Sequence, residues 1–182
     1  MAPPKTLATM EDGEWEQVME INLAGPYNLT RAVVPHLKEK GGSIVNISSV
    51  AGKNMSLGAG MHYTTTKWGL IGFSRHTAYE LSPYGIRVNI VCPGPTRTGL
   101  INGDDEAAMA KLGEGVPLGR PVEATDVANA ILFFISPLST MCTGSELVVD
   151  GGVLIGSGNT LEQYYNSRGG EMPARKIAEK EA

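Results

Sequence analysis

The chain has little of what covalent cross-linking or metal binding would require. Its two cysteines, Cys92 and Cys142, are too few for a disulfide framework and lack the spacing of a metal-binding motif. We therefore predict no metal site. Such low cysteine usage is typical of a reducing compartment, so we expect a cytoplasmic protein.

Long hydrophobic stretches and a charge excess are also absent. The longest clearly apolar run, residues 130–135, is too short to cross a bilayer, and residues 1–6 contain no apolar signal core. A net charge of -4 gives no reason to expect nucleic acid or an anionic membrane as a partner. We therefore predict neither kind of partner.

What the chain does have is the composition of one globular domain. It contains 182 residues, of which 42% are hydrophobic and 19% are charged. A chain of this length can bury a substantial core. Its glycines and prolines divide it into short segments, as is common in α/β proteins.

Apolar residues recur at helical spacing in several segments. The first helix is predicted from residue 13 to about residue 40, capped by residues 9–12 and kinked at Gly25-Pro26 and Pro35. A second long helix is predicted over residues 61–82, where Pro83 and Gly85 end it. Shorter helices are expected near 104–112, over 123–135 and near 173–181.

Three short β-rich runs alternate with these helices. We predict a buried parallel strand at 43–48 and further strands at 86–91 and 146–149. This alternation predicts an α/β fold with a parallel sheet of about three strands, flanked by helices. In such sheets ligands bind beyond the carboxyl ends of the strands. Ser48 and Ser49 follow one such end, and Pro93 and Gly94 follow another.

Tyr63 and Lys67 are four residues apart on the second long helix, so their side chains share a face. A tyrosine has a pKa near 10, and lowering it to about 7 requires roughly 4 kcal/mol. A cation about 5 Å away supplies roughly 3 kcal/mol at an effective dielectric constant of 20. The pair is therefore suited to proton transfer at an alcohol or carbonyl oxygen.

Four features occur in a fixed order: Asn22, the Ser48-Ser49 pair, Tyr63 with Lys67, and the Pro93-Gly94 turn. This order, over about residues 5–152, resembles the catalytic half of a short-chain dehydrogenase/reductase. The resemblance implies a Rossmann-type sheet and hydride transfer between NAD or NADP and a secondary alcohol or ketone.

The resemblance also implies a role for each site residue. The catalytic residues would be Asn22, Ser49, Tyr63 and Lys67, with Tyr63 as acid/base and Lys67 lowering its pKa. Ser49 would bind the substrate oxygen, and Asn22 would hold a water that passes the proton on. The gap between Ser49 and Tyr63 is one residue longer than is usual in close relatives, which we interpret as a one-residue insertion within residues 53–61; Ser48 stays open for the serine role.

The cofactor-binding residues implied by the resemblance come from two places. Tyr63 and Lys67 would hold the nicotinamide ribose, and Pro93, Gly94, Thr96 and Thr98 would contact the rest of that end of the cofactor. Residues 99–119 correspond to the variable lid over a small alcohol or carbonyl substrate. Helices 13–40 and 61–82 correspond to the main oligomer interface of the family, which implies a homodimer or homotetramer.

The phosphate-binding Gly-x-x-x-Gly-x-Gly turn of the family is not found at its usual place. Residues 152–158 fit that pattern, but no amphipathic helix follows them, so we reject them as a phosphate loop. We therefore interpret residues 1–157 as the C-terminal portion of a truncated Rossmann-type domain that lacks its first βαβ units, and residues 158–182 as a polar tail. Two alternatives to the enzyme stay open: an inactive protein that forms oligomers, and an incomplete gene product.

Overall fold

The computed structural model describes residues 5–56, 58–99, 104–156 and 160–174. The chain divides into two compact units, one of residues 1–92 and 128–148 and the other of residues 93–127 and 149–182. The elements of the described residues are α1 (Glu14–Met19), the π-helical turn η1 (Glu20–Ala24), α2 (Gly25–Leu37), β1 (Gly42–Ile47), η2 (Val50–Gly52), α3 (Met61–Leu81), η3 (Ser82–Tyr84), β2 (Ile86–Pro93), α4 (Glu106–Glu114), α5 (Ala124–Ile135), η5 (Pro137–Ser139), β3 (Glu146–Val149) and α6 (Leu161–Asn166).

The sheet has the predicted parallel arrangement. Among the described strands the order is β1-β2-β3, and β1 pairs with β2 from Gly42 opposite Ile86 to Ile47 opposite Val91. Hydrogen bonds from Ile90 N to Ser145 O and from Gly144 N to Val88 O join β2 to the segment that leads into β3. The α/β fold class and the strand positions, within two residues, are therefore confirmed.

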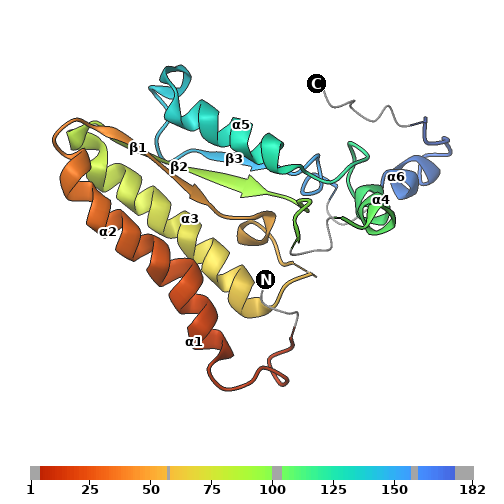
Figure 1. Ribbon diagram of the computed structural model, residues 1–182. Coiled ribbons are helices and arrows are strands. Elements are labelled where there is room, and N and C mark those ends of the chain that lie inside the picture. The colour runs from red at the N-terminus through yellow and green to blue at the C-terminus, as the bar shows by residue number, and fades with distance from the viewer. Residues whose placement is uncertain (1–4, 57, 100–103, 157–159, 175–182) are drawn as a thin grey trace. The chain divides into compact units, whose positions relative to one another are not determined.

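Helices cover both faces of this sheet (Figure 1). Helices α2 and α3 lie side by side on one face, where the buried residues Ala78, Leu81, Ile86 and Val88 form a core with Val34, Leu37 and Ile44. The part of α5 after residue 127 lies on the other face, and the Ser43 hydroxyl donates to the Phe134 carbonyl at 3.0 Å. The core is thus built mainly around β2.

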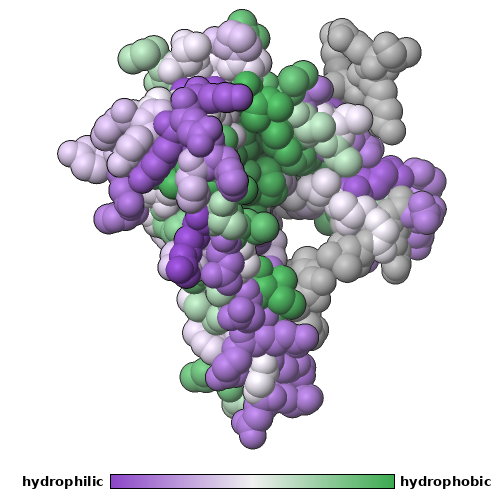
Figure 2. Space-filling view, turned by 60° about the vertical axis from the view of Figure 1, so that its left-hand side comes forward, coloured by the Kyte–Doolittle hydropathy of each residue, from purple (hydrophilic) through white to green (hydrophobic). Residues whose placement is uncertain are grey.

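Strand β1 is less buried than predicted. Its two end residues are exposed and its middle is half-buried, whereas Val88, Ile90 and Val91 of β2 are fully buried. The physical reason is that, among the described strands, β1 has a neighbour on one side only. Apolar side chains therefore remain accessible, among them Ile47 of β1 and Leu132 and Ile135 of α5, and Figure 2 shows hydrophobic surface beside hydrophilic side chains.

The first long helix is interrupted by a π-helical turn. Residues 20–24 adopt this wider turn just before Gly25, and Pro35 lies inside α2. The predicted cap at residues 9–12 is wrong. The N-cap residue is Gly13, whose φ of 84° is left-handed and which makes no side-chain cap. Thr9 instead closes a local turn, in which its hydroxyl accepts a hydrogen bond from Thr6 N at 3.0 Å.

The second unit is organised by turns. Gly94 N donates to Val149 O at 2.9 Å, and the buried Asp150 carboxylate accepts hydrogen bonds from Gly152 N and Leu154 N. Helix α4 begins two residues later than predicted and is capped by Asp105. The tail contains the six-residue helix α6, whereas most of the helix expected near 173–181, and the end of the 152–158 glycine pattern, lie outside the described residues.

Candidate active site

Tyr63 and Lys67 occupy the first two turns of α3, close to the carboxyl end of β1. The Lys67 ammonium donates a hydrogen bond to the Ile47 carbonyl at 2.9 Å. The same nitrogen lies 5.4 Å from the centroid of the Tyr63 ring. Helix spacing puts the two side chains on one face, and the end of β1 fixes where the lysine head lies.

The two serines after β1 make different contacts. Ser48 is buried, and its hydroxyl donates to the backbone carbonyl of Lys67 at 2.9 Å. Ser49 has extended backbone, and its hydroxyl accepts a hydrogen bond from Ala51 N at 3.1 Å. Ser49 also hydrogen-bonds the Tyr63 side chain. The structure thus brings Ser49, Tyr63 and Lys67 together and directs the Ser48 hydroxyl to the helix backbone.

Burial dominates the electrostatics of this cluster. It raises the pKa of Tyr63, and the hydrogen bond from Ser49 acts in the opposite direction. Burial also lowers the pKa of Lys67, while a negative charge on the nearby Cys92 sulfur would raise it. The sequence analysis expects Lys67 to lower the Tyr63 pKa, but here that pKa is raised, with burial as the main cause and Ser49 as the opposing one. Both groups therefore favour their neutral forms more than they would in water.

Cys92 lies beside these residues at the end of β2. Its thiol is buried, which raises its pKa to about 11, with a further rise from the negative charge of Glu146. A positive charge on Lys53 and hydrogen bonds from Ser49 and Ser48 act in the opposite direction. The thiol is therefore protonated at neutral pH and behaves as a small apolar side chain.

Asn22 lies in the π-helical turn and contacts α3 through a residue that the sequence analysis missed. Its amide nitrogen lies 3.5 Å from the Thr66 hydroxyl, which in turn donates to the Tyr63 carbonyl at 2.7 Å. π-Helical turns recur at functional sites. The spacing of Thr66, three residues after Tyr63, is the sequence signal that would have pointed to it.

The loop that carries Ser49 lies in close contact with α3. A Cβ atom on Gly52 would lie 2.6 Å from the Ser48 hydroxyl, 2.8 Å from the Lys67 carbonyl and 2.9 Å from Ile71 Cδ1. Real Cβ atoms do not come so near, so only glycine fits at this position. The absence of a side chain at residue 52 thus allows the serine loop to approach the helix that carries Tyr63 and Lys67.

The four other predicted cofactor-binding residues belong to the second unit. Pro93 ends β2, and a Cβ atom on Gly94 would lie 2.8 Å from Asp150 Cα, so the close approach of these two segments requires glycine. The Thr96 hydroxyl donates to the Gly94 carbonyl at 2.9 Å, and Thr96 forms a parallel bridge with Val122. The side chain of Thr98 is exposed.

Two further properties bear on the kind of site this is. None of the helices described in the structure is long and apolar enough to cross a membrane. Across the described ranges, the His, Cys, Asp and Glu side chains form no group that could hold a metal ion.

Comparisons with known proteins agree on one family. A family profile described as enoyl-(acyl carrier protein) reductase matches residues 1–154. The trans-4-hydroxycyclohexanecarboxylate dehydrogenase of Sinomonas cyclohexanicum is 40% identical over 166 residues, covering 87% of this chain and 59% of that protein. An uncharacterised short-chain type dehydrogenase/reductase of Sinorhizobium fredii is 38% identical over 156 residues, covering 84% of this chain and 61% of that protein.

A solved structure extends the similarity to the fold. The crystal structure of a 3-oxoacyl-[acyl-carrier protein] reductase with bound NAD, from Brucella melitensis, matches with a TM-score of 0.73 and 38% identity, covering 84% of this chain and 56% of that one. The chain thus spans less than two thirds of the length of these relatives. The match of most of this chain to such proteins shows that it belongs to the short-chain dehydrogenase/reductase family.

Proposed function

We propose that the protein transfers hydride between NAD(P) and a secondary alcohol or ketone, and that this chain supplies the proton-transfer part of the site. The observation that carries the proposal is the meeting of Ser49, Tyr63 and Lys67 at the end of β1. In this proposal residues 1–157 are part of a Rossmann-type domain and residues 158–182 are a tail. The cysteine content favours a cytoplasmic location.

Tyr63 is the group that moves the proton. Its phenol donates to a carbonyl oxygen during reduction, or accepts the proton of an alcohol during oxidation. The Ser49 hydroxyl, which hydrogen-bonds the phenol, orients the substrate oxygen beside it. Lys67 stabilises the phenolate that forms, and Asn22 connects the group to solvent.

The residues present fit a nicotinamide cofactor. A lysine ammonium has three donors, and the bond from Lys67 to Ile47 uses one of them. We propose that the others hold ribose hydroxyls together with Tyr63. Pro93, Gly94, Thr96 and Thr98 would hold the rest of the nicotinamide end. The cofactor, when bound, supplies the hydride donor or acceptor and a positive charge in its oxidised form.

Titration of the purified chain with NADH and NADPH, followed by nicotinamide fluorescence, tests this proposal. We expect saturable binding that is weakened most in Lys67→Met, because the ammonium donors are lost, and less in Tyr63→Phe, which removes one hydroxyl contact to the ribose. A preference between the two cofactors would distinguish NAD from NADP use. A folded chain that binds neither would contradict cofactor binding by this chain.

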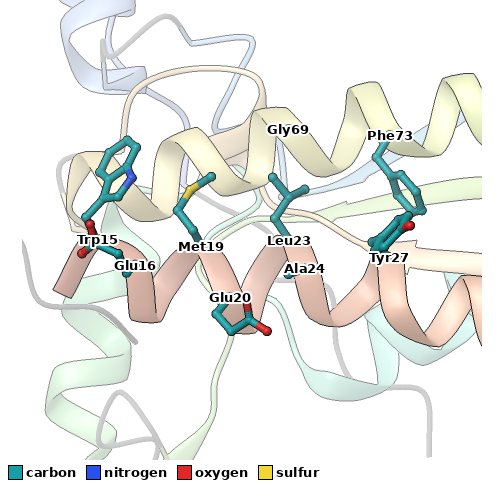
Figure 3. Close-up of a pocket in the computed structure, with 9 residues that line it drawn as sticks. All are labelled: Trp15, Glu16, Met19, Glu20, Leu23, Ala24, Tyr27, Gly69 and Phe73. Atoms are coloured by element: carbon teal, nitrogen blue, oxygen red, sulfur yellow. The ribbon is translucent and has the colours of Figure 1, made fainter. Parts of the chain in front are cut away.

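A second candidate function is assembly into homo-oligomers, and a groove on the first unit favours it. Residues Trp15, Met19, Leu23 and Tyr27 of the first long helix point toward α3, where Gly69 and Phe73 complete the lining (Figure 3). The Tyr27 and Phe73 rings meet edge to face, with centroids 6.2 Å apart. Trp15 and Tyr27 remain partly exposed. An apolar groove between two long helices suits a second copy of the chain.

Sedimentation velocity of the chain and of Met19→Lys tests the assembly. We expect a dimer or tetramer that dissociates in Met19→Lys, because burying the new lysine ammonium in the interface would remove its hydration at a cost in free energy. The control is Met141→Lys, which makes the same substitution at an exposed residue outside both long helices. A monomeric wild-type chain at micromolar concentration would contradict this candidate.

A further inference from the structure

A buried carboxylate connects the serine loop to the catalytic helix. The Glu146 side chain, at the start of β3, is 8% exposed. It accepts a hydrogen bond from the Lys53 ammonium and pairs with the Arg75 guanidinium at 2.5 Å. Its two cations come from different segments: Lys53 directly follows η2, and Arg75 lies on α3.

We propose that Glu146 is a positioning residue, which holds the loop bearing Ser49 against the helix bearing Tyr63 and Lys67 by binding Lys53 and Arg75 at the same time. The role in catalysis rests on the proposed function, whereas the mechanical link does not. Glu146 makes its ion pairs with Lys53 and Arg75, so it acts through the loop.

The geometry around Lys53 supports this link. Lys53 follows Gly52, where the loop lies in close contact with α3, and it precedes Asn54, whose N–H donates to Val50 O. The missing side chain at Gly52 allows the loop to lie close to α3 but does not itself hold the loop there. The Ser48 hydroxyl holds the start of the loop to α3, and the Lys53–Glu146–Arg75 cluster is suited to hold its end.

Burial of the Glu146 carboxylate strengthens the cluster, whereas the side chains of its cations Lys53 and Arg75 are 33% and 62% exposed. A buried carboxylate faced by two cations interacts with them more strongly than a fully exposed pair does. Removing the charge of Glu146 leaves both cations without their partner. The exposed pair of Lys5 with Glu11, whose acidic side chain is 79% exposed, provides a contrast on the same unit.

Glu146→Gln is the sharpest test, because it keeps the shape of the side chain and removes its charge. We expect hydrogen exchange at the amides of Gly52, Lys53 and Asn54 to become about tenfold faster, the equivalent of about 1.4 kcal/mol in loop opening. Glu11→Gln, which removes the same charge from the exposed pair, serves as the control and leaves those amides unchanged. Equal exchange in wild type and Glu146→Gln would overturn the proposal.

A second readout separates positioning from plain stabilisation. If the loop moves away, Tyr63 loses its hydrogen bond to Ser49 and its ionisation midpoint rises. Removing a nearby negative charge acts directly in the opposite direction, so an upward shift reports the loop. The shift should be absent when Glu146→Gln is added to Ser49→Ala. A midpoint that stays or falls while stability decreases would mean that Glu146 is only structural.

Two features keep the test decisive. If Glu146→Gln does not fold, Lys53→Met removes the loop's own cation, and the same acceleration of exchange is expected; unchanged exchange in this variant would overturn the proposal. Both readouts are made on the chain without cofactor. Failure of nicotinamide binding therefore contradicts the proposed function alone, and an unchanged loop contradicts the positioning role alone.

Discussion

The hydroxyl of Ser48 donates a hydrogen bond to the backbone carbonyl of Lys67, 2.9 Å away. This contact joins the end of β1 to α3, and the two neighbouring serines make different contacts. The Ser48 hydroxyl is directed to the helix backbone, whereas the Ser49 hydroxyl faces Tyr63.

Ser48→Ala should therefore weaken the fold. The substitution removes the hydroxyl and leaves the Lys67 carbonyl without this donor, so we expect the free energy of unfolding to fall by about 1 kcal/mol. Urea denaturation followed by circular dichroism measures this change. The Tyr63 titration in the same variant should match that of the wild type, and a large shift there would show that Ser48 acts at the phenol.

Gly52→Ala should be more harmful. The new methyl group would overlap the Ser48 hydroxyl, the Lys67 carbonyl and Ile71, and we expect a loss of about 1–3 kcal/mol in urea denaturation. Gly72→Ala is the matched control, because a Cβ atom there meets nothing within 4 Å. In that exposed helical position alanine should stabilise the chain by about 0.5–1 kcal/mol. Equal effects of the two substitutions would contradict the close packing at residue 52.

Tyr63 should ionise above its ordinary pKa of 10.0 in the chain without cofactor. The difference in phenolate absorbance between wild type and Tyr63→Phe isolates this residue from the other tyrosines. Ser49→Ala should raise the pKa further, because it removes the hydrogen bond that lowers it. A midpoint below 10 in the wild type would mean that Lys67, rather than burial, dominates.

The raised pKa of Tyr63 also makes stability depend on pH. Just above pH 10 the unfolded chain has released the Tyr63 proton and the folded chain still holds it, so the free energy of unfolding falls as pH rises. Tyr63→Phe removes this contribution. Thermal melts from pH 9 upward should therefore fall less steeply with pH in that variant than in the wild type.

His62→Leu should stabilise the chain. His62 is fully buried, and neither ring nitrogen has a hydrogen-bond partner among the described residues. Replacing such a polar ring with an apolar side chain should raise the free energy of unfolding by about 1–2 kcal/mol. His76→Leu, at an exposed position of the same helix, should change it by less than about 0.5 kcal/mol. A loss of stability in His62→Leu would indicate that the ring makes a contact of its own.

The sequence predicts the fold here better than it predicts burial. Periodicity locates β3 to the residue and α3 to within one residue, because local side-chain pattern decides them. It misjudges β1, since the burial of a strand depends on its neighbours in the sheet. The cap at Gly13 and the π-helical turn at residues 20–24 carry no local signal of that kind.

In the site, too, local pattern predicts some features, whereas others depend on the tertiary structure. Tyr63 and Lys67 are evident from their spacing, but the choice between Ser48 and Ser49 requires the direction of each hydroxyl. The link between Lys53 and Glu146 joins residues 93 positions apart, so no local pattern predicts it. Contacts of this kind depend on the tertiary fold, which brings segments that are distant in the sequence together.

The π-helical turn determines which way the first long helix faces. A regular α-helix turns by about 100° per residue, so a side chain four residues further on points about 40° away around the helix axis. Trp15 and Tyr27 are three such steps apart, so in a regular helix their directions would differ by roughly 120°. A turn that takes one additional residue recovers much of that rotation, which is how both side chains line one groove. Deleting a single residue from 20–24 would therefore leave eleven regular steps between Trp15 and Tyr27, about 20° from in phase, so both side chains should still face α3 in a helix without the wider turn.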